Sequence, residues 1–204
     1  MSGDAWNHNI HSHDLVLRAL PAHAQRALDV GCGQGLLARQ LAIHCEEVIA
    51  IDKDHATLVS AEGKGNAEPR VKFIKGDVMT YPFPDGSFDV ITVVAALHHL
   101  PLKPALERFR DLLRPGGVLA AIGLFRSHTL VDFAYFATAM STSYILRCAH
   151  RYVDVGAPLQ DPQETLLEIR NACDALLPGS VLKRQLLFRY SLIWRKPNSK
   201  SSSR

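Results

Sequence analysis

The chain has 204 residues, of which 47% are hydrophobic and 21% charged, and its formal net charge is +3 at pH 7. These values are typical of a globular domain, and without a Lys/Arg block interleaved with aromatic residues they argue against a nucleic-acid partner. No apolar run approaches the ~20 residues that a membrane span needs and no signal-peptide core is visible, while the four dispersed cysteines indicate free thiols, so we expect a cytoplasmic protein.

Strand-like and helix-like stretches alternate along the first part of the chain. Apolar runs predict strands over 27–30, 48–52, 71–74, 88–95 and 118–124. Apolar residues at helical spacing predict helices over 34–44, 55–62 and 104–113. The last of these helices is predicted to begin with Pro104 and to be stopped by the Arg-Pro-Gly-Gly of 114–117. Such alternation is typical of a parallel, doubly wound sheet.

The second part of the chain changes character. An apolar and aromatic stretch over 126–148 is predicted to be helical. The sequence Asp-Pro-Gln-Glu at 161–164 predicts a capping box at the start of the next helix, which Pro178-Gly179 ends. Two tightly joined strands are then predicted over 181–187 and 189–196.

The run Ala-Leu-Asp-Val-Gly-Cys-Gly-Gln-Gly over residues 27–35 is the most informative stretch. An apolar strand carries Asp29 near its end and leads into a loop with glycine at every second position, where a ligand can lie against bare backbone. A dinucleotide site would read G-x-G-x-x-G, but here the third glycine comes one residue early. Asp29 would also repel a pyrophosphate, whereas it suits a ligand carrying an ammonium and a sulfonium group.

These residues resemble motif I of the class I S-adenosylmethionine-dependent methyltransferases. The resemblance implies S-adenosylmethionine as cofactor and a loop that binds it through Asp29, Gly31, Cys32, Gly33 and Gly35. Further along, Asp52 closes the second predicted strand 21 residues after Gly31. A carboxylate there can accept two hydrogen bonds from ribose hydroxyls; the alternative is a helix N-cap, for which Asp54 is better placed.

The segment after the third predicted strand, Lys-Gly-Asp-Val at 75–78, strengthens the resemblance. A Gly-Asp pair alone is an ordinary turn, but the residues that follow, 81–89, closely resemble the signature of the family after this strand. The resemblance implies that Asp77 accepts a hydrogen bond from the adenine amino group and that the N–H of Val78 reaches a ring nitrogen. It also implies cofactor contacts from Lys53, Gly76 and Ala95.

The fourth predicted strand runs into Ala-Ala-Leu-His-His-Leu at 95–100, where the family brings the methyl group and its acceptor together. His98 and His99 are candidates for acid–base work or for positioning the acceptor, because imidazole titrates near neutrality. The alternative is that one imidazole ring forms a hydrogen bond with the backbone and only shapes the pocket. We expect His98 to be a catalytic and substrate-contacting residue.

Three further side chains are candidates for contact with the acceptor. His8 and His11 belong to a histidine-rich segment that also contains His13, and family members often carry an N-terminal segment that folds over the cofactor. A solvated helix start is the alternative, and the spacing does not support a metal site. Tyr135 lies in the aromatic stretch, which is either a lid over an apolar acceptor or an ordinary packing or dimer face.

Together these features predict an α/β fold with a doubly wound, seven-stranded, mostly parallel Rossmann-like sheet and an antiparallel terminal strand. We expect one methyltransferase domain over 1–197, with a cap segment over 1–20, a helical insertion over 125–160 and a disordered tail over 198–204. The implied reaction is in-line methyl transfer to a small-molecule acceptor, which asks the protein chiefly for proximity and alignment. The alternatives are a non-catalytic S-adenosylmethionine-binding regulator and, disfavoured by the glycine spacing, a nicotinamide-dependent oxidoreductase. The sequence does not determine the oligomeric state.

Overall fold

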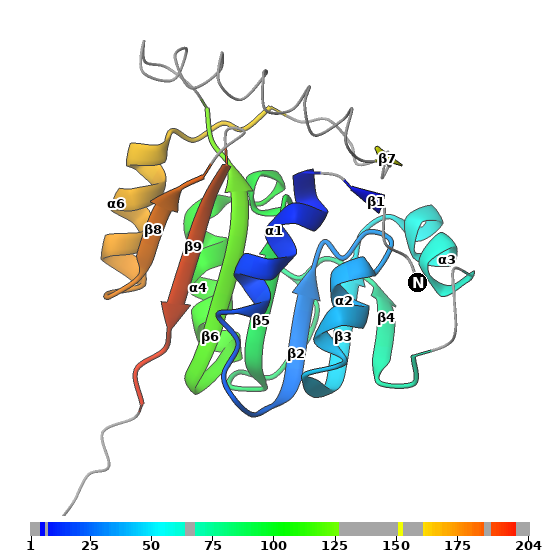
Figure 1. The fold of residues 1–204 in the computed structure, drawn as a ribbon. Coiled ribbons are helices and arrows are strands. Elements are labelled where there is room, and N and C mark those ends of the chain that lie inside the picture. The colour runs from blue at the N-terminus through cyan, green and yellow to red at the C-terminus, as the bar shows by residue number, and fades with distance from the viewer. Residues whose placement is uncertain are drawn as a thin grey trace, which may run out of the picture.

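In the computed structural model the chain folds around a seven-stranded sheet with the order β4-β3-β2-β5-β6-β9-β8 (Figure 1). The structure describes residues 5–6, 8–63, 68–126, 151–152, 161–185 and 189–198. The strands of the sheet are β2 (Ala24–Val30), β3 (Cys45–Asp52), β4 (Val71–Lys75), β5 (Phe88–Val94), β6 (Leu113–Leu124), β8 (Val181–Arg184) and β9 (Arg189–Arg195).

Five neighbouring strands are parallel, and β9 runs antiparallel to both β6 and β8. This confirms the predicted sheet, including its antiparallel strand near the end of the chain. The strand order reverses at β2, which pairs with β3 on one side and with β5 on the other. In open parallel sheets such a switch point creates the crevice in which ligands bind, at the carboxyl ends of the strands.

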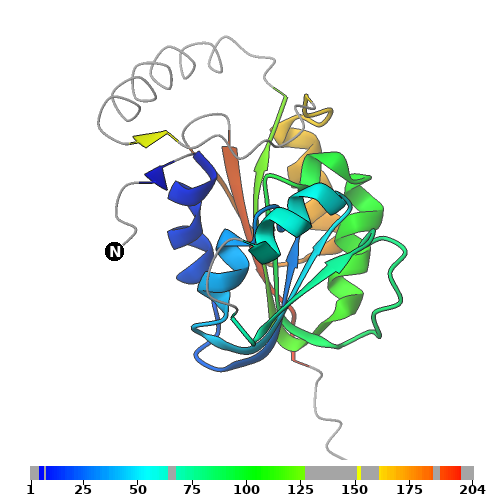
Figure 2. The ribbon, with the colours of Figure 1, turned by 90° about the vertical axis from the view of Figure 1, so that its right-hand side faces the viewer.

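Helices cover both faces of the sheet, as the view in Figure 2 shows. The helices are α1 (His8–Leu17), α2 (Leu36–Leu41), α3 (His55–Gly63), the short 3₁₀ helix η1 (Leu97–His99), α4 (Leu102–Leu112) and α6 (Leu166–Leu176). In the part of the chain that the structure describes, no helix is long and apolar enough to cross a membrane.

The alternation of side chains along the strands divides the core into two clusters. In β2, Leu28 and Val30 pack in the cluster under α4 and α6, while Ala27 packs in the cluster under α1, α2 and α3. Because both faces are buried, the central strands are mostly apolar rather than alternating with polar residues. This explains why the sequence shows them as continuous hydrophobic runs.

Two predicted helix starts were wrong. Helix α4 begins at Leu102 with Pro101 as its N-cap residue, so Pro104 lies inside the first turn rather than at the first position. Helix α6 begins at Leu166, where Thr165 and Glu168 form the capping box that we had predicted at 161–164. Both Ser/Thr-x-x-Glu and Asp-x-x-Glu patterns occur here within a few residues, and the hydroxyl is the one that accepts from the third helical N–H.

The residues predicted to form a loop after α4 instead begin β6. The N–H of Gly116 donates to the carbonyl of Lys196 at 2.9 Å, and the N–H of Lys196 donates to the carbonyl of Gly117 at 2.9 Å. This pairing with the end of β9 extends the sheet through a Pro-Gly-Gly sequence that, read locally, indicates only a turn.

A short strand in the predicted cap pairs with a short strand in the predicted insertion. Strand β1 (Ala5–Trp6) pairs in parallel with β7 (Arg151–Tyr152). Most of the predicted insertion, with Tyr135 in it, and all but the first residue of the predicted tail lie outside the described residues.

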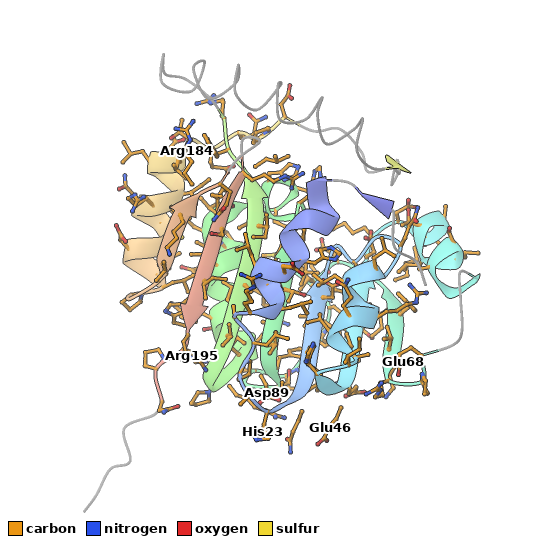
Figure 3. The ribbon with its side chains drawn as sticks, in the orientation of Figure 1. His23, Glu46, Glu68, Asp89, Arg184 and Arg195 are labelled. Carbon is orange, nitrogen blue, oxygen red and sulfur yellow. The ribbon has the colours of Figure 1, made fainter. Side chains whose placement is uncertain are left out.

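At the edge opposite the carboxyl ends, Asp89 ties three segments together, and its place is labelled in Figure 3. Its carboxylate accepts from the backbone N–H of Gln25 at 2.9 Å and of Arg26 at 2.8 Å, and from the guanidinium of Arg114 at 3.0 Å. The side chain is 20% exposed, so these charge-assisted bonds are partly shielded from solvent.

We expect Asp89→Ala to lower the free energy of unfolding by about 2–3 kcal/mol, because it leaves two backbone donors and a cation without their acceptor. The matched control is Asp85→Ala. Asp85 is 75% exposed with a single 3.5 Å contact to Arg108, and the change there should cost less than about 0.5 kcal/mol. Urea unfolding of the two variants measures the difference, and equal losses would contradict this account of Asp89.

Candidate functional site

The carboxyl ends of β2, β3, β4 and β5 lie side by side at one edge of the sheet, and hydrogen bonds join the segments that leave them. The N–H of Gly31 donates to the carbonyl of Ile51 at 2.9 Å, and the N–H of Gly76 donates to the carbonyl of Asp52 at 2.9 Å. The parallel register therefore brings together the segments that the sequence singled out over residues 29–35, 52–53, 76–78 and 95–98.

The loop after β2 requires glycine for two different reasons. At Gly31, φ is +67° and a Cβ atom would lie 2.4 Å from the Cβ of Ala96, so the loop approaches the segment after β5 as closely as backbone allows. At Gly33, φ is +52° and no atom lies within 4 Å of the place a Cβ would take. The loop thus packs against β5 on one side and leaves bare backbone on the other. Gly35 is the N-cap residue of α2.

Asp52 links this loop to the start of α3. Its Oδ2 accepts from the N–H of Gly33 at 2.9 Å, and its Oδ1 accepts from the N–H of Asp54 at 3.0 Å. The cap of α3 is Asp54, whose carboxylate accepts from the N–H of Ala56 at 3.0 Å and from the hydroxyl of Thr57. The structure therefore decides against the N-cap alternative for Asp52, which holds the loop and keeps a half-buried carboxylate at the site.

Asp29 is buried beneath the loop, at 2% exposure. Its Oδ1 accepts from the hydroxyl of Thr92 at 2.7 Å, whereas its Oδ2 is buried with no hydrogen-bond partner. Burial raises the pKa of Asp29 to about 7, and the nearby charge of Asp52 adds to this rise while the Thr92 bond opposes it. The site thus holds a carboxyl group that titrates near neutrality and that a cationic ligand would convert to its charged form.

Asp77 and Lys53 face one another across the ends of β3 and β4. The ammonium of Lys53 lies 3.1 Å from Oδ2 of Asp77, and Oδ1 of Asp77 accepts from the N–H of Met79 at 2.9 Å. Burial alone would raise the pKa of Asp77, but these two partners hold it below its ordinary value. Val78 is buried, and its side chain packs in the core, so only its backbone can face a ligand.

Cys32 also turns its side chain inward. Its thiol lies in the core cluster under α2, and burial raises its pKa, so it stays protonated. A contact between Cys32 and a bound cofactor would therefore come from the backbone of the loop.

The segment after β5 is held in a less common conformation. Ala95 has φ +53°, and no other residue but glycine within the described segments has positive φ. Such backbone conformations cost free energy and concentrate at functional sites. The next turn is η1, in which His98 is 8% exposed with an Nδ1 that has no hydrogen-bond partner. Its ring lies against that of His99, with centroids 4.1 Å apart.

Burial, together with the charges of His99 and Arg189, lowers the pKa of His98 to about 4. At neutral pH the ring is therefore uncharged, and its Nδ1 is available to a ligand.

The N-terminal histidines divide into two kinds. His13 is buried, and its Nδ1 lies 2.7 Å from the amide oxygen of Gln40, so it joins α1 to α2 instead of facing a ligand. His8 and His11 lie in the first turns of α1, and their side chains lie outside the described part of the structure. Among the described residues, no group of three His, Cys, Asp or Glu side chains could hold a metal ion.

Two contributing residues were missed in the sequence. Thr92 stands beside Asp29 in the register of β2 and β5, and a hydroxyl inside the apolar run Val-Ile-Thr-Val-Val was the available signal. Arg39 donates from α2 to the carbonyls of Gln34 at 2.9 Å and Gly35 at 3.1 Å, which stiffens the loop from below. Its spacing from Gly35 is helical, but nothing local distinguishes it from a surface arginine.

The residues present fit a ligand with an ammonium group and a nucleoside. An unpartnered carboxyl oxygen at Asp29, open backbone at Gly33 and the carboxylates of Asp52 and Asp77 follow one another along the same edge. This arrangement differs from a pyrophosphate site, in which backbone amides and a helix N-terminus face an anion.

Comparison with known proteins shows the family of this chain. Residues 28–121 match the family model of the methyltransferase domain. An uncharacterized methyltransferase of Mycobacterium tuberculosis is 35% identical over 194 residues, which cover 94% of this chain and 98% of the relative. The 27-O-demethylrifamycin SV methyltransferase of Amycolatopsis mediterranei is 34% identical over 113 residues, covering 52% of this chain and 42% of that protein.

Solved structures show the same fold at low identity. The N-methyltransferase NodS of Bradyrhizobium japonicum, in complex with S-adenosyl-L-homocysteine, superposes with a TM-score of 0.64 at 17% identity over 93% of this chain and 87% of that chain. Fold and site define a class I S-adenosylmethionine-dependent methyltransferase. The chain belongs to the methyltransferase domain family, which sets aside the oxidoreductase alternative.

The raised pKa of Asp29 predicts how the free energy of unfolding of the cofactor-free protein depends on pH. Its pKa is about 7 in the folded protein and about 4 in the unfolded chain, so the folded state keeps its proton to higher pH. The stability that Asp29 contributes is present below pH 4 and is lost as the pH rises through 7. We expect the free energy of unfolding of the native protein minus that of Asp29→Asn to fall between pH 4.5 and 7.5. Urea titrations of both proteins across this range test it; a difference that is constant with pH would contradict it.

Proposed function

We propose that this methyltransferase acts on a small-molecule acceptor that is held beside His98 at the carboxyl edge of the sheet. The observation that carries the proposal is the buried, uncharged His98, whose Nδ1 has no partner. His98 lies three residues after Ala95, which has positive φ, and the intervening Ala96 lies against Gly31 of the glycine loop.

When bound, S-adenosylmethionine supplies a methyl group on a positively charged sulfur. In the proposed arrangement Asp52 accepts hydrogen bonds from the ribose hydroxyls and Asp77 with Val78 holds the adenine. The carboxylate of Asp29 faces the ammonium group from beneath the loop. The floor of the cofactor site is formed by Gly31, Gly33, Gly35 and the backbone of Cys32. Lys53 and Gly76 position Asp77 and Asp52, and Ala95 borders the methyl group.

The chain's own part in the reaction is alignment. Methyl transfer needs the acceptor atom in line with the sulfur–methyl bond at about 3–3.5 Å, and holding that geometry accounts for much of the rate. The neutral ring of His98 can accept a hydrogen bond or a proton from the acceptor. Because its pKa lies near 4, it is a weak base at neutral pH, and orientation of the acceptor is its larger contribution.

We also propose that residues 1–20 form a cap and residues 125–160 an insertion over this site. The pairing of β1 with β7 supports this, since it joins the two segments, and α1 begins at the carboxyl edge of the sheet (Figure 1). The position of α1 supports a role for His8 and His11 in contacting the acceptor, and Tyr135 belongs to the same proposed insertion. Free, buried cysteines at positions 32, 45 and 173 support a cytoplasmic location.

The test is turnover of labelled methyl donor with a panel of hydroxyl, amine, thiol and carboxylic acid acceptors. Methylated product above the rate without enzyme is expected for one chemical class. Normal binding of S-adenosylmethionine with no turnover on any class would favour the non-catalytic regulator instead.

We expect Asp52→Ala to weaken binding of S-adenosylmethionine by about 2–3 kcal/mol, because a charged acceptor for two hydroxyls is removed. Asp54→Ala is the matched control, two residues away. It removes the cap of α3 and should cost about 1 kcal/mol of stability while leaving cofactor affinity nearly unchanged. Calorimetric titration of both folded variants makes the comparison, and an unchanged dissociation constant for Asp52→Ala would show that the ribose is held elsewhere.

We expect His98→Ala to lower turnover by about 10²-fold, with little change in cofactor affinity. In the native enzyme with S-adenosylmethionine at saturation, so that the titration of Asp29 does not limit the rate, kcat/KM for the acceptor should fall with decreasing pH only well below pH 6.5, following the lowered pKa of His98. The variant His99→Ala removes a charge that lowers this pKa and should move the fall to higher pH. A pH–rate profile that is identical in all three proteins would exclude His98 from the reaction.

A further inference from the structure

Arg189 occupies an unusual place for a charged residue. It is the first residue of β9 and pairs with Leu124, the last residue of β6, so it lies at the carboxyl edge of the sheet. Along β9, Tyr190, Leu192 and Trp194 pack in the cluster under α4 and α6, whereas Ile193 packs in the cluster under α1. Alternation places Arg189 on the same face as Ile193, the face that α1 covers.

The guanidinium group of Arg189 is buried, and two of its nitrogens have no hydrogen-bond acceptor among the described residues. Arg189 is 9% exposed, and its Nε and Nη1 have no hydrogen-bond partner. Within the described ranges it forms no ion pair. Burial lowers its pKa to about 10, so it keeps its charge at neutral pH. Buried cations in proteins are normally paired, because an unpaired one loses its hydration with nothing in return.

A second unpartnered group lies nearby. The Nδ1 of His98 is also buried without a hydrogen-bond partner, and His98 follows β5, the strand that pairs with β6, whose last residue pairs with Arg189. The charge of Arg189 is the smallest of three contributions that lower the pKa of this ring. Among the described residues, the other arginines at this end are engaged elsewhere or exposed. Arg184, labelled in Figure 3, lies over the ring of Phe125 at 5.2 Å, and Arg126 is exposed. Glu168 is used in the capping box of α6.

We propose that Arg189 binds a carboxylate group of the methyl acceptor next to His98, so that the substrates of this enzyme are acidic small molecules. A guanidinium with free donors matches a carboxylate in charge and planarity. A single free cation suits a monoanion better than a dianionic phosphate. This inference rests on the proposed function, since it places the acceptor beside His98.

The chain offers a matched pair of variants on one strand. Arg195 ends β9 at the opposite edge of the sheet, where it is exposed and donates to the carbonyl of Gly116 at 3.1 Å (Figure 3). Arg189→Met and Arg195→Met therefore remove the same charge from the same strand. The first is expected to raise the melting temperature of the ligand-free protein, because an uncompensated buried charge is replaced by an apolar side chain of similar length. The second should lower it slightly or leave it unchanged.

Binding is measured by NMR titration in the presence of S-adenosyl-L-homocysteine with benzoate against benzamide and octanoate against octanamide. The native protein and Arg195→Met should prefer the acid of at least one pair by about 10- to 100-fold, and Arg189→Met should lose that preference. Arg189→Lys keeps the charge and should retain part of it. No preference in the native protein, or an unchanged preference in folded Arg189→Met, would overturn the proposal.

Failure of this inference is distinguishable from failure of the proposed function. Preference for the acid is a binding measurement and needs no turnover, whereas the proposed function fails only if no class of acceptor is methylated. If neutral acceptors are methylated at equal rates by the native enzyme and by Arg189→Met while no acid binds, the enzyme is a small-molecule methyltransferase without a carboxylate site.

Discussion

The site depends on one constraint, the position of β2 between β3 and β5 in a parallel register. That register sets Asp29 beside Thr92 and aligns the ends of three strands, so that the loop after β2 meets the segments after β3 and β5. The close approach of Gly31 to Ala96 follows from it and admits no side chain. The hydrogen bond from Gly33 to Asp52 then holds the loop open toward the ligand side.

At this edge, three side chains carry buried polar atoms that have no hydrogen-bond partner among the described residues. Asp29 beneath the loop is a carboxyl group with a free oxygen, and His98 and Arg189 beyond the loop carry free nitrogens. Each costs stability in the free protein, since its hydration is lost and no protein group replaces it. By contrast, Asp89 at the opposite edge satisfies both of its oxygens with backbone and Arg114. Asp29, His98 and Arg189 thus lie at the edge where we propose that ligands bind, and the fully bonded Asp89 lies at the edge that is structural.

This arrangement suggests how a methyltransferase can discriminate among acceptors without a strong base. In the proposed arrangement, the buried cation of Arg189 and the neutral imidazole of His98 would select and orient an acidic molecule, and alignment would then supply most of the acceleration. The family model of the methyltransferase domain matches residues 28–121, whereas Arg189 comes from a strand of the C-terminal part, outside those residues. Specificity in this chain is thus expected to come from a different part of the sequence than cofactor binding.

The sequence by itself determined the cofactor half of the protein. The glycine loop, the acidic residue at the end of β3 and the Gly-Asp after β4 are local patterns, because each lies at or directly after the end of its strand. The alternation of strands and helices likewise determined the sheet, since both faces had to be covered. Helix starts were less certain, because competing caps such as those at Asp161 and Thr165 differ only in which side chain reaches the helix.

Only the tertiary structure decided which polar side chains are buried and which of them have hydrogen-bond partners. Nothing around Arg189 in the sequence separates it from Arg195, yet pairing with opposite ends of β6 buries one and exposes the other. In the same way, the partner of Asp29 and the low pKa of His98 arise from residues distant in the chain. Burial and partnership depend on long-range contacts, so they are properties of the fold and not of any local pattern.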